Sequence, residues 1–179
     1  SQGQVTVKLS NGTSFTTGVV AGTAIATGDT ATTVATKVAN SNNNVTESST
    51  VTWIAAAGAS TQTIGGMTIT TVAAETAANI AIVAAGGVVA GTTITTASTL
   101  WNVTAGVAAG TTTFTSKTAN ANVADLGAGA FTGFTAAPTA VLVSQGNTAL
   151  ANVTTSASGA NLVIDYNAAY AAAGSEDVA

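Results

Sequence analysis

Much of the chain alternates between β-branched or apolar residues and Thr or Ser, the period of a β-strand with one buried face. The first such stretch covers residues 5–9. It is followed by Asn11-Gly12, a dipeptide typical of tight hairpin turns, so residues 13–17 are predicted to return as a second strand. Further strands are predicted over residues 50–54, 67–70, 92–96, 111–116, 140–144 and 162–166.

Two segments have the period of an amphipathic helix instead. Residues 30–39 follow Asp29, a good residue for a helix start, and their apolar positions lie on one helical face. Residues 76–85 show the same pattern and end at Gly86-Gly87, which favours helix termination. The predicted fold is therefore mainly β, an antiparallel β-sandwich or roll with two short amphipathic helices at about 30–39 and 76–85.

The order of strand, Gly turn, strand, helix and strand occurs twice, which indicates an approximate internal repeat. The first copy covers residues 5–57 and the second covers residues 61–118, with strands and a tail over residues 119–179. A chain of this length buries one good core, so residues 1–179 are expected to form a single compact β-rich unit.

Composition changes the expected function more than the expected fold. The chain has three lysines and seven carboxylates but no Arg, His or Cys, and charged residues make up 6% of it, against about 25% in ordinary globular domains. The residues used for acid–base and nucleophilic catalysis and for soft-metal binding are scarce or missing. We therefore expect a protein that is not an enzyme and that needs no cofactor, with calcium left open.

Charge and hydropathy also limit the partners. A net charge of −4 provides no basic patch, so we expect no nucleic-acid binding. The longest apolar run, residues 80–90, is too short to span a bilayer, and we expect no membrane span. Few Lys residues and a first residue Ser1 favour a secreted product or an excised module, located outside the cell or at its surface.

Individual residues suggest a few candidate sites, each with a structural alternative. Calcium would need several converging oxygen ligands, and Asp29, Asp125 and Asp165 are the weak candidates, with a helix cap or a turn the favoured role for Asp29. Trp53, Trp101 and Phe114 are expected to be core anchors, although an exposed Trp would suit carbohydrate binding. Glycosylation sequons begin at Asn11, Asn44, Asn102 and Asn152.

The segment around the second copy resembles a known class of protein. Ile64-Gly65-Gly66-Met67-Thr68-Ile69-Thr70, then Thr76-Ala77, and then the Thr-rich run 111–126 are similar to Thr/Ala-rich modules of large bacterial surface proteins, namely RTX-associated repeat adhesins and surface-layer proteins. The match covers about residues 61–126, with a fainter copy at 28–39. The resemblance implies non-catalytic spacers or lattice-forming units. Its calcium-binding Gly-Gly-x-Gly-x-Asp repeats are missing here, so calcium-dependent folding does not carry over.

Strand edges without charges are open to pairing with another chain. Val5, Val7 and Leu9 lie on alternating positions of the N-terminal strand, so residues 1–9 are a candidate donor strand for a neighbouring copy. We therefore expect a structural subunit of a secreted filament or surface layer that assembles with its own copies. Two alternatives remain: a domain of a large adhesin that binds a surface or a carbohydrate, and a virion decoration or fibre protein.

Overall fold

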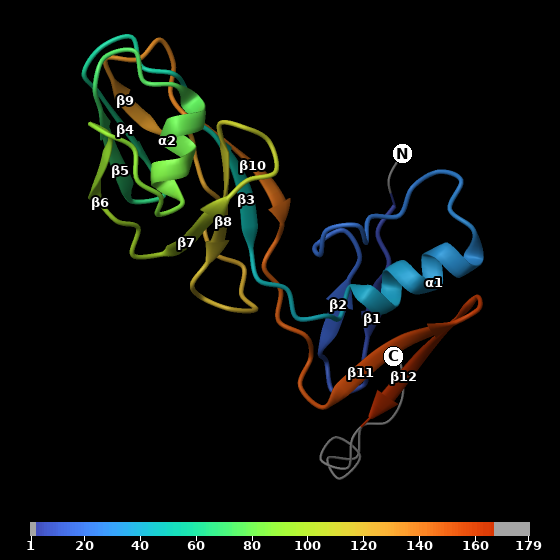
Figure 1. The fold of residues 1–179 in the computed structure, drawn as a ribbon. Coiled ribbons are helices and arrows are strands. Elements are labelled where there is room, and N and C mark those ends of the chain that lie inside the picture. Colours follow the sequence, from blue (N-terminus) through green and yellow to red (C-terminus); the bar gives the residue numbers. More distant parts are fainter. Residues whose placement is uncertain (1–2, 167–179) are drawn as a thin grey trace. The chain divides into compact units, whose positions relative to one another are not determined.

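The computed structural model describes residues 3–166 and is mainly β, with antiparallel sheets and two short helices, which confirms the predicted fold class. The contacts divide the chain into two compact units rather than the single unit expected (Figure 1). Unit 1 consists of Ser1–Thr46, Asn120–Asn122 and Ser144–Ala179, and unit 2 consists of Glu47–Ala119 and Val123–Val143. No helix in the described part of the chain is long and apolar enough to cross a membrane.

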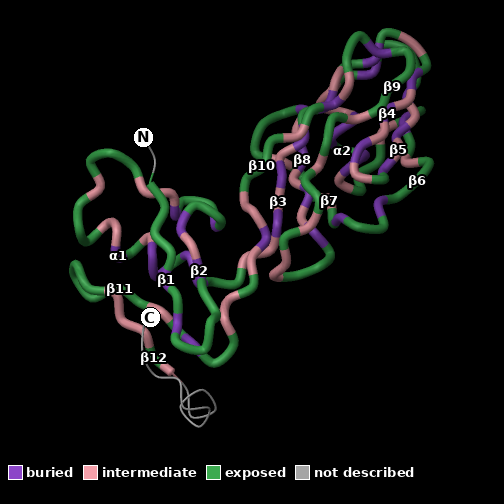
Figure 2. The backbone as a smooth tube through the Cα atoms, turned by 180° about the vertical axis from the view of Figure 1, so that it is seen from behind, coloured by how far each residue is buried: buried purple, intermediate pink, exposed green. Residues whose placement is uncertain are grey.

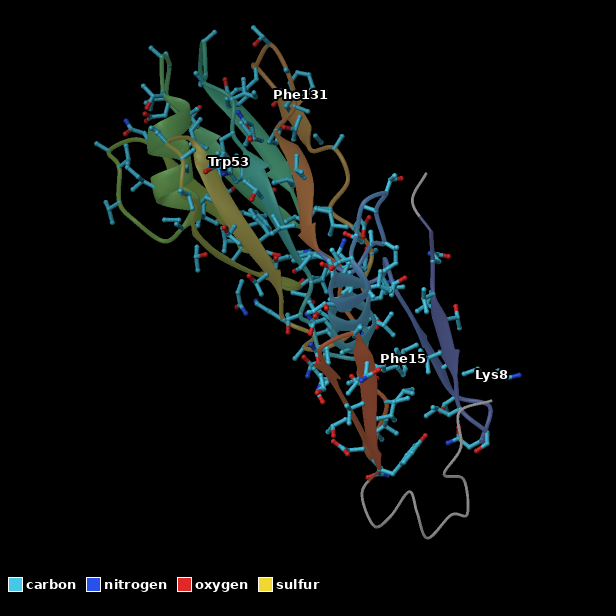
Figure 3. All side chains as sticks on the ribbon, turned by 90° about the vertical axis from the view of Figure 1, so that its right-hand side faces the viewer. Lys8, Phe15, Trp53 and Phe131 are labelled. Atoms are coloured by element: carbon cyan, nitrogen blue, oxygen red, sulfur yellow. The ribbon has the colours of Figure 1, made fainter. Side chains whose placement is uncertain are left out.

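Unit 1 is built from two hairpins and one helix. Strands β1 (Thr6–Lys8) and β2 (Ser14–Thr16) form the first hairpin, and β11 (Val153–Ser158) and β12 (Asn161–Tyr166) form the second. Helix α1 (Ala31–Asn40) packs on the second hairpin and shares a small core with both. Figure 3 shows Lys8 and Phe15 on opposite faces of the first hairpin, and only Phe15 is buried.

Unit 2 contains two four-stranded antiparallel sheets and helix α2 (Ala77–Ala84). In spatial order, the first sheet is β10 (Thr139–Ser144), β3 (Ser48–Thr52), β8 (Thr111–Ser116) and β7 (Trp101–Ala105). The second is β6 (Thr93–Thr96), β5 (Met67–Thr71), β4 (Ser60–Ile64) and β9 (Ala130–Thr132). Apolar residues of both sheets form one cluster with the buried side of α2, a sandwich-like arrangement.

The core of unit 2 depends on a few large side chains among many small ones. Trp53 is 1% exposed, its indole Nε1 donates a hydrogen bond to Thr112 Oγ1 at 2.9 Å, and its ring tilts against Phe114 at a centroid distance of 6.4 Å. Trp101 and Phe114 are also buried. The three aromatic residues expected to be core anchors therefore lie in this core, and Figure 2 shows buried segments along β3 and β8.

Both helices begin in the same way, because the sequence repeats an acidic residue, a Thr and an Ala. Thr30 and Thr76 are the N-caps, and each Oγ1 accepts the backbone N–H three residues later. Asp29 and Glu75 precede these caps. The helices lie at Ala31–Asn40 and Ala77–Ala84, within one residue of the predicted bounds, which confirms both of them.

The two copies of the repeat are nested instead of lying in tandem. In unit 2 the hairpin β4–β5, helix α2 and the hairpin β7–β8 follow each other along the chain, with β6 between. In unit 1 the hairpin β1–β2 and helix α1 are completed by β11–β12, which returns only after the whole of unit 2. Strand β3, placed in the first copy by the sequence, pairs with β8 in unit 2. The predicted copy 5–57 therefore does not close on itself, and the tail beyond residue 166 lies outside the described residues.

Candidate assembly surface

The outer faces of both sheets of unit 2 are covered mainly by Thr. On one sheet Thr61 pairs with Thr70 and Thr63 with Thr68, and the hydroxyls of the second pair lie 2.8 Å apart. On the other sheet Thr50 pairs with Thr113 and Thr52 with Thr111. Threonine is β-branched and therefore suits a strand, while its hydroxyl keeps the outer face wetted without any charge. Strands β3 to β10 contain no charged residue at all.

Strand β10 breaks this pattern. It is an edge strand, paired only with β3, and it carries apolar residues where its neighbours carry Thr. Val141 is 66% exposed, Val143 is 54% exposed and Leu142 is 40% exposed. Figure 2 shows β10 as mostly exposed beside the partly buried β3. An edge of this kind is a template for pairing with another chain, and the usual blockers, charges and prolines within the strand, are missing.

The second sheet ends at β9, which lies directly before β10 in the chain. Phe131 on β9 is 43% exposed, although it pairs with the buried Gln62 and so lies on the inner side of the sheet. The two edge strands are joined through a loop held by the bond from Gly129 N–H to the Pro138 carbonyl at 3.1 Å. We call Val141, Leu142 and Val143 the edge patch. It consists of three consecutive apolar residues of β10 that are exposed.

The N-terminal donor-strand candidates lie elsewhere, in unit 1. Val7 is 8% exposed and Leu9 is fully buried, both in the core that they share with Phe15 and α1, whereas Val5 is 36% exposed. Strand β1 already pairs with β2 of its own chain. Donating residues 1–9 to a neighbour would therefore empty the core of unit 1, and we do not retain them as a donor strand.

The acidic candidates are spread over the chain. Asp29 accepts the backbone N–H of Ala26 at 2.7 Å and pairs with Lys37 Nζ at 2.7 Å, and these two contacts, the first being the stronger, lower its pKa. Asp165 lies on β12, and Asp125 lies in unit 2 between β8 and β9. Within residues 3–166 no three acidic residues come close enough to hold a metal ion.

Glu75, which the sequence did not single out, is the more structured carboxylate. It is 6% exposed and accepts hydrogen bonds from the Thr92 hydroxyl at 2.5 Å, the Asn79 side-chain amide at 2.6 Å and the Thr76 backbone N–H at 3.1 Å. The Thr92 bond, followed by the Asn79 bond, lowers the pKa of Glu75 despite its burial. Its carboxylate thus ties the start of α2 to the segment before β6. The signal in the sequence is its position, directly before a helix-capping Thr, which Asp29 shares.

These two lowered pKa values predict a loss of stability in acid. Unfolded Glu and Asp titrate near about 4.3 and 3.9. The pKa values of Glu75 and Asp29 are lower in the folded chain than in the unfolded chain. As the pH falls through the unfolded values, the unfolded chain therefore binds more protons than the folded chain, and the free energy of unfolding decreases. Their stabilisation is therefore complete above this range and is lost as the pH drops through the folded values. Urea unfolding between about pH 6 and pH 2 should show the decline, and E75Q should flatten it. An unchanged slope in E75Q would contradict the assignment to Glu75.

The four sequon asparagines are all exposed, but their surroundings differ. Asn11 lies at the turn of the β1–β2 hairpin, and Asn102 lies on β7. Asn44 Oδ1 accepts the Ala149 backbone N–H at 2.9 Å. Asn152 has a left-handed backbone with φ of 66° directly before β11.

The open cavities of the structure lack paired acid–base groups. In unit 1 a hollow of about 460 Å³ lies beside Leu150, Asp165 and Tyr166, and a groove of similar volume runs along the apolar face of α1 past Asp29. Asp165 is the one carboxylate lining the first, and Asp29, already paired with Lys37, is the one lining the second. The first is also lined by Tyr166, and neither lining contains two carboxylates.

The edge patch is an exposed apolar run on an uncharged edge strand, and in this it differs from the Thr-covered faces of the two sheets. No protein-family model, no curated protein and no solved structure matches this chain.

Proposed function

We propose that the chain is a non-catalytic structural subunit of a secreted filament or surface layer, which associates with its own copies by strand pairing at β10. The observation that carries this proposal is the exposed run Val141, Leu142 and Val143 on an uncharged edge strand. The resemblance of residues 61–126 to modules of bacterial surface proteins supports the same function. The location of the subunit outside the cell is part of the proposal.

Pairing at β10 would be favoured by both the backbone and the side chains. The free edge of β10 offers backbone N–H and C=O groups for a ladder with an added strand. Burying the outward Val141 and Val143 against a second copy would contribute about 1.5–3 kcal/mol for each side chain that becomes fully buried. A second copy is the proposed occupant, because every copy carries the same uncharged edge. Pairing of two β10 edges about a twofold axis would close a dimer, so a filament or layer would need a further contact between such dimers.

A lysine on the edge tests the proposal. V141K places a charge on the outward face of β10, so pairing would have to bury that charge or give up the contact. We expect assembly of the wild-type chain on concentration, and an increase of about tenfold or more in the concentration that V141K needs. Sedimentation and electron microscopy provide the measurement. V107K, at a fully exposed loop position of unit 2, is the matched control. Equal assembly of V141K and the wild type would overturn the proposal.

A second candidate is a module of a large adhesin, favoured by the Thr-covered outer faces of unit 2. Rows of uncharged hydroxyls can hydrogen-bond to a polar surface or a carbohydrate without the desolvation cost of charges. Trp53 and Trp101 are 1% and 4% exposed, so their rings are not available to stack on a carbohydrate. Replacing Thr70 with Val should weaken binding to such a surface in this case, and it should leave assembly through β10 unchanged.

A further inference from the structure

The turn of the β1–β2 hairpin brings the Asn and Thr of one sequon into direct contact. Asn11 Oδ1 accepts two hydrogen bonds from Thr13, one from the backbone N–H at 2.9 Å and one from the hydroxyl at 2.6 Å. Both residues are exposed, and the space beside Gly12 is open. The Asn11 Nδ2 group is thereby presented to solvent at a hairpin tip.

The other three sequons have different surroundings. The Thr46 hydroxyl, two residues after Asn44, accepts the Asn120 backbone N–H instead. Asn102 and Thr104 lie on one face of β7, where successive residues on a face are about 6.6 Å apart. Thr154, two residues after Asn152, is the second residue of β11 and pairs with Asp165. Asn11 is thus bound by the hydroxyl of its own threonine, whereas the side-chain oxygen of Asn44 is bound by the Ala149 backbone N–H.

We infer that Asn11 is the glycan acceptor of the folded chain, modified by a transferase that uses a lipid-pyrophosphate-linked oligosaccharide. In this reaction Nδ2 attacks C1 of the donor sugar, the bond from C1 to the pyrophosphate oxygen breaks, and the lipid pyrophosphate leaves with the electron pair. Nδ2 gives one proton to a base of the transferase, and no group is oxidised or reduced. This inference is independent of self-association at β10.

The two hydrogen bonds give Asn11 its advantage as an acceptor. An amide nitrogen is a poor nucleophile because its lone pair is shared with the carbonyl. As Nδ2 loses its proton, negative charge accumulates on Oδ1, and the Thr13 hydroxyl and N–H are already positioned to stabilise it. Gly12 makes the turn possible with a φ of 88°, which a β-branched residue does not adopt without strain.

The test uses the folded, purified full-length chain with a sequon-directed oligosaccharyltransferase and its lipid-linked oligosaccharide. Glycopeptide mass spectrometry measures occupancy at the four asparagines. We expect Asn11 to be occupied about tenfold more than Asn44, Asn102 or Asn152, as the loss of one hydrogen bond to the reacting amide would give. In the urea-unfolded chain this preference should disappear.

The variant G12V separates the effect of the turn geometry at Asn11 from the effect of the sequon sequence. It converts Asn-Gly-Thr into Asn-Val-Thr, the same sequon that begins at the other three asparagines. We expect occupancy at Asn11 to drop about tenfold in G12V, because the turn that joins Asn11 to Thr13 is lost. Circular dichroism checks that G12V stays folded, and T13S, which keeps the hydroxyl, should retain most of the occupancy. Equal occupancy of all four sites in the folded wild type, or unchanged Asn11 occupancy in a folded G12V, would overturn the inference.

Discussion

Replacing Trp53 with Ala is expected to destabilise unit 2 by about 3–5 kcal/mol, a large part of the total stability of a domain of this size. Trp53 is 1% exposed and lies directly after β3, where it packs on Phe114 from β8. Removing the indole would leave a cavity among small neighbours that cannot move in to fill it. The Thr112 hydroxyl, which is fully buried, would also lose its partner.

Urea unfolding followed by fluorescence provides the measurement. Trp101 is the second Trp of the chain and lies in unit 2, so the signal that remains in W53A reports on that unit. W53F is the matched control, because it keeps an aromatic ring in the core and removes the hydrogen bond to Thr112. We expect a loss of about 1–3 kcal/mol for W53F, smaller than for W53A. A W53A variant that unfolds at the wild-type urea concentration would show that the core does not depend on this side chain.

The dependence on one aromatic residue follows from the composition. Aromatic residues make up 4% of the chain, and much of the apolar content is Ala, which buries little surface. The inner positions of the strands include Ser49, Ser60 and Thr112, whose hydroxyls add little apolar burial. Stability is therefore concentrated in a few contacts between large side chains instead of being spread evenly over the core.

Local features were predicted well because they depend on residues that are close together in the sequence. The helices needed only an apolar period of 3.6 residues, with Asp29 at the start of the first and Gly86-Gly87 at the end of the second. The N-cap of the first helix is Thr30 instead of Asp29, and that of the second is Thr76. The first hairpin needed only the Asn11-Gly12 turn between two alternating segments. Strands β7, β9 and β11 were missed, and the three residues of β9 are too few to show a period.

The nesting of the two units was beyond such local reasoning. Nothing near α1 indicates that its second hairpin lies at β11 and β12, because the pairing of a helix with a distant hairpin depends on contacts far apart in sequence. The position of β3 shows the same limit. Its alternation predicted a strand correctly, but the choice of β8 as partner depends on how Val51 packs with the core of unit 2.

The exposure of the edge patch was not predicted from the sequence, for a related reason. A continuous apolar run such as residues 140–143 is the pattern of a strand buried on both faces, and only its place at the edge of the sheet makes it exposed. The donor-strand hypothesis had the opposite problem. The alternation of Val7 and Leu9 indicates one apolar face, but it does not say whether the chain itself or a neighbour covers that face, and here it is the chain's own α1 and β2.

The close passage of three chain segments in unit 1 leads to the second large expected effect, that of G146A. Gly146 lies where the chain returns from unit 2, against the backbone of residues 121 and 122, and an added Cβ would overlap the Ala121 carbonyl group. The flanking residues hold this crossing in place. Gln145 Nε2 donates to Asn122 Oδ1 at 2.7 Å, and Asn147 exchanges backbone hydrogen bonds with Val45 at 2.8 and 2.9 Å.

Because the collision is with backbone, no side-chain rotation relieves it, and the segments must separate. We expect G146A to lose stability at the upper end of about 1–3 kcal/mol, and the Val45 and Asn147 amides to exchange their hydrogens faster than in the wild type. G127A is the matched control, since the space beside Gly127 is open, and it should stay within about 0.5 kcal/mol of the wild type. Hydrogen exchange and urea unfolding of both variants provide the comparison. If G146A kept wild-type protection at Val45 and Asn147, the crossing would not be the tight junction that joins α1 to its closing hairpin.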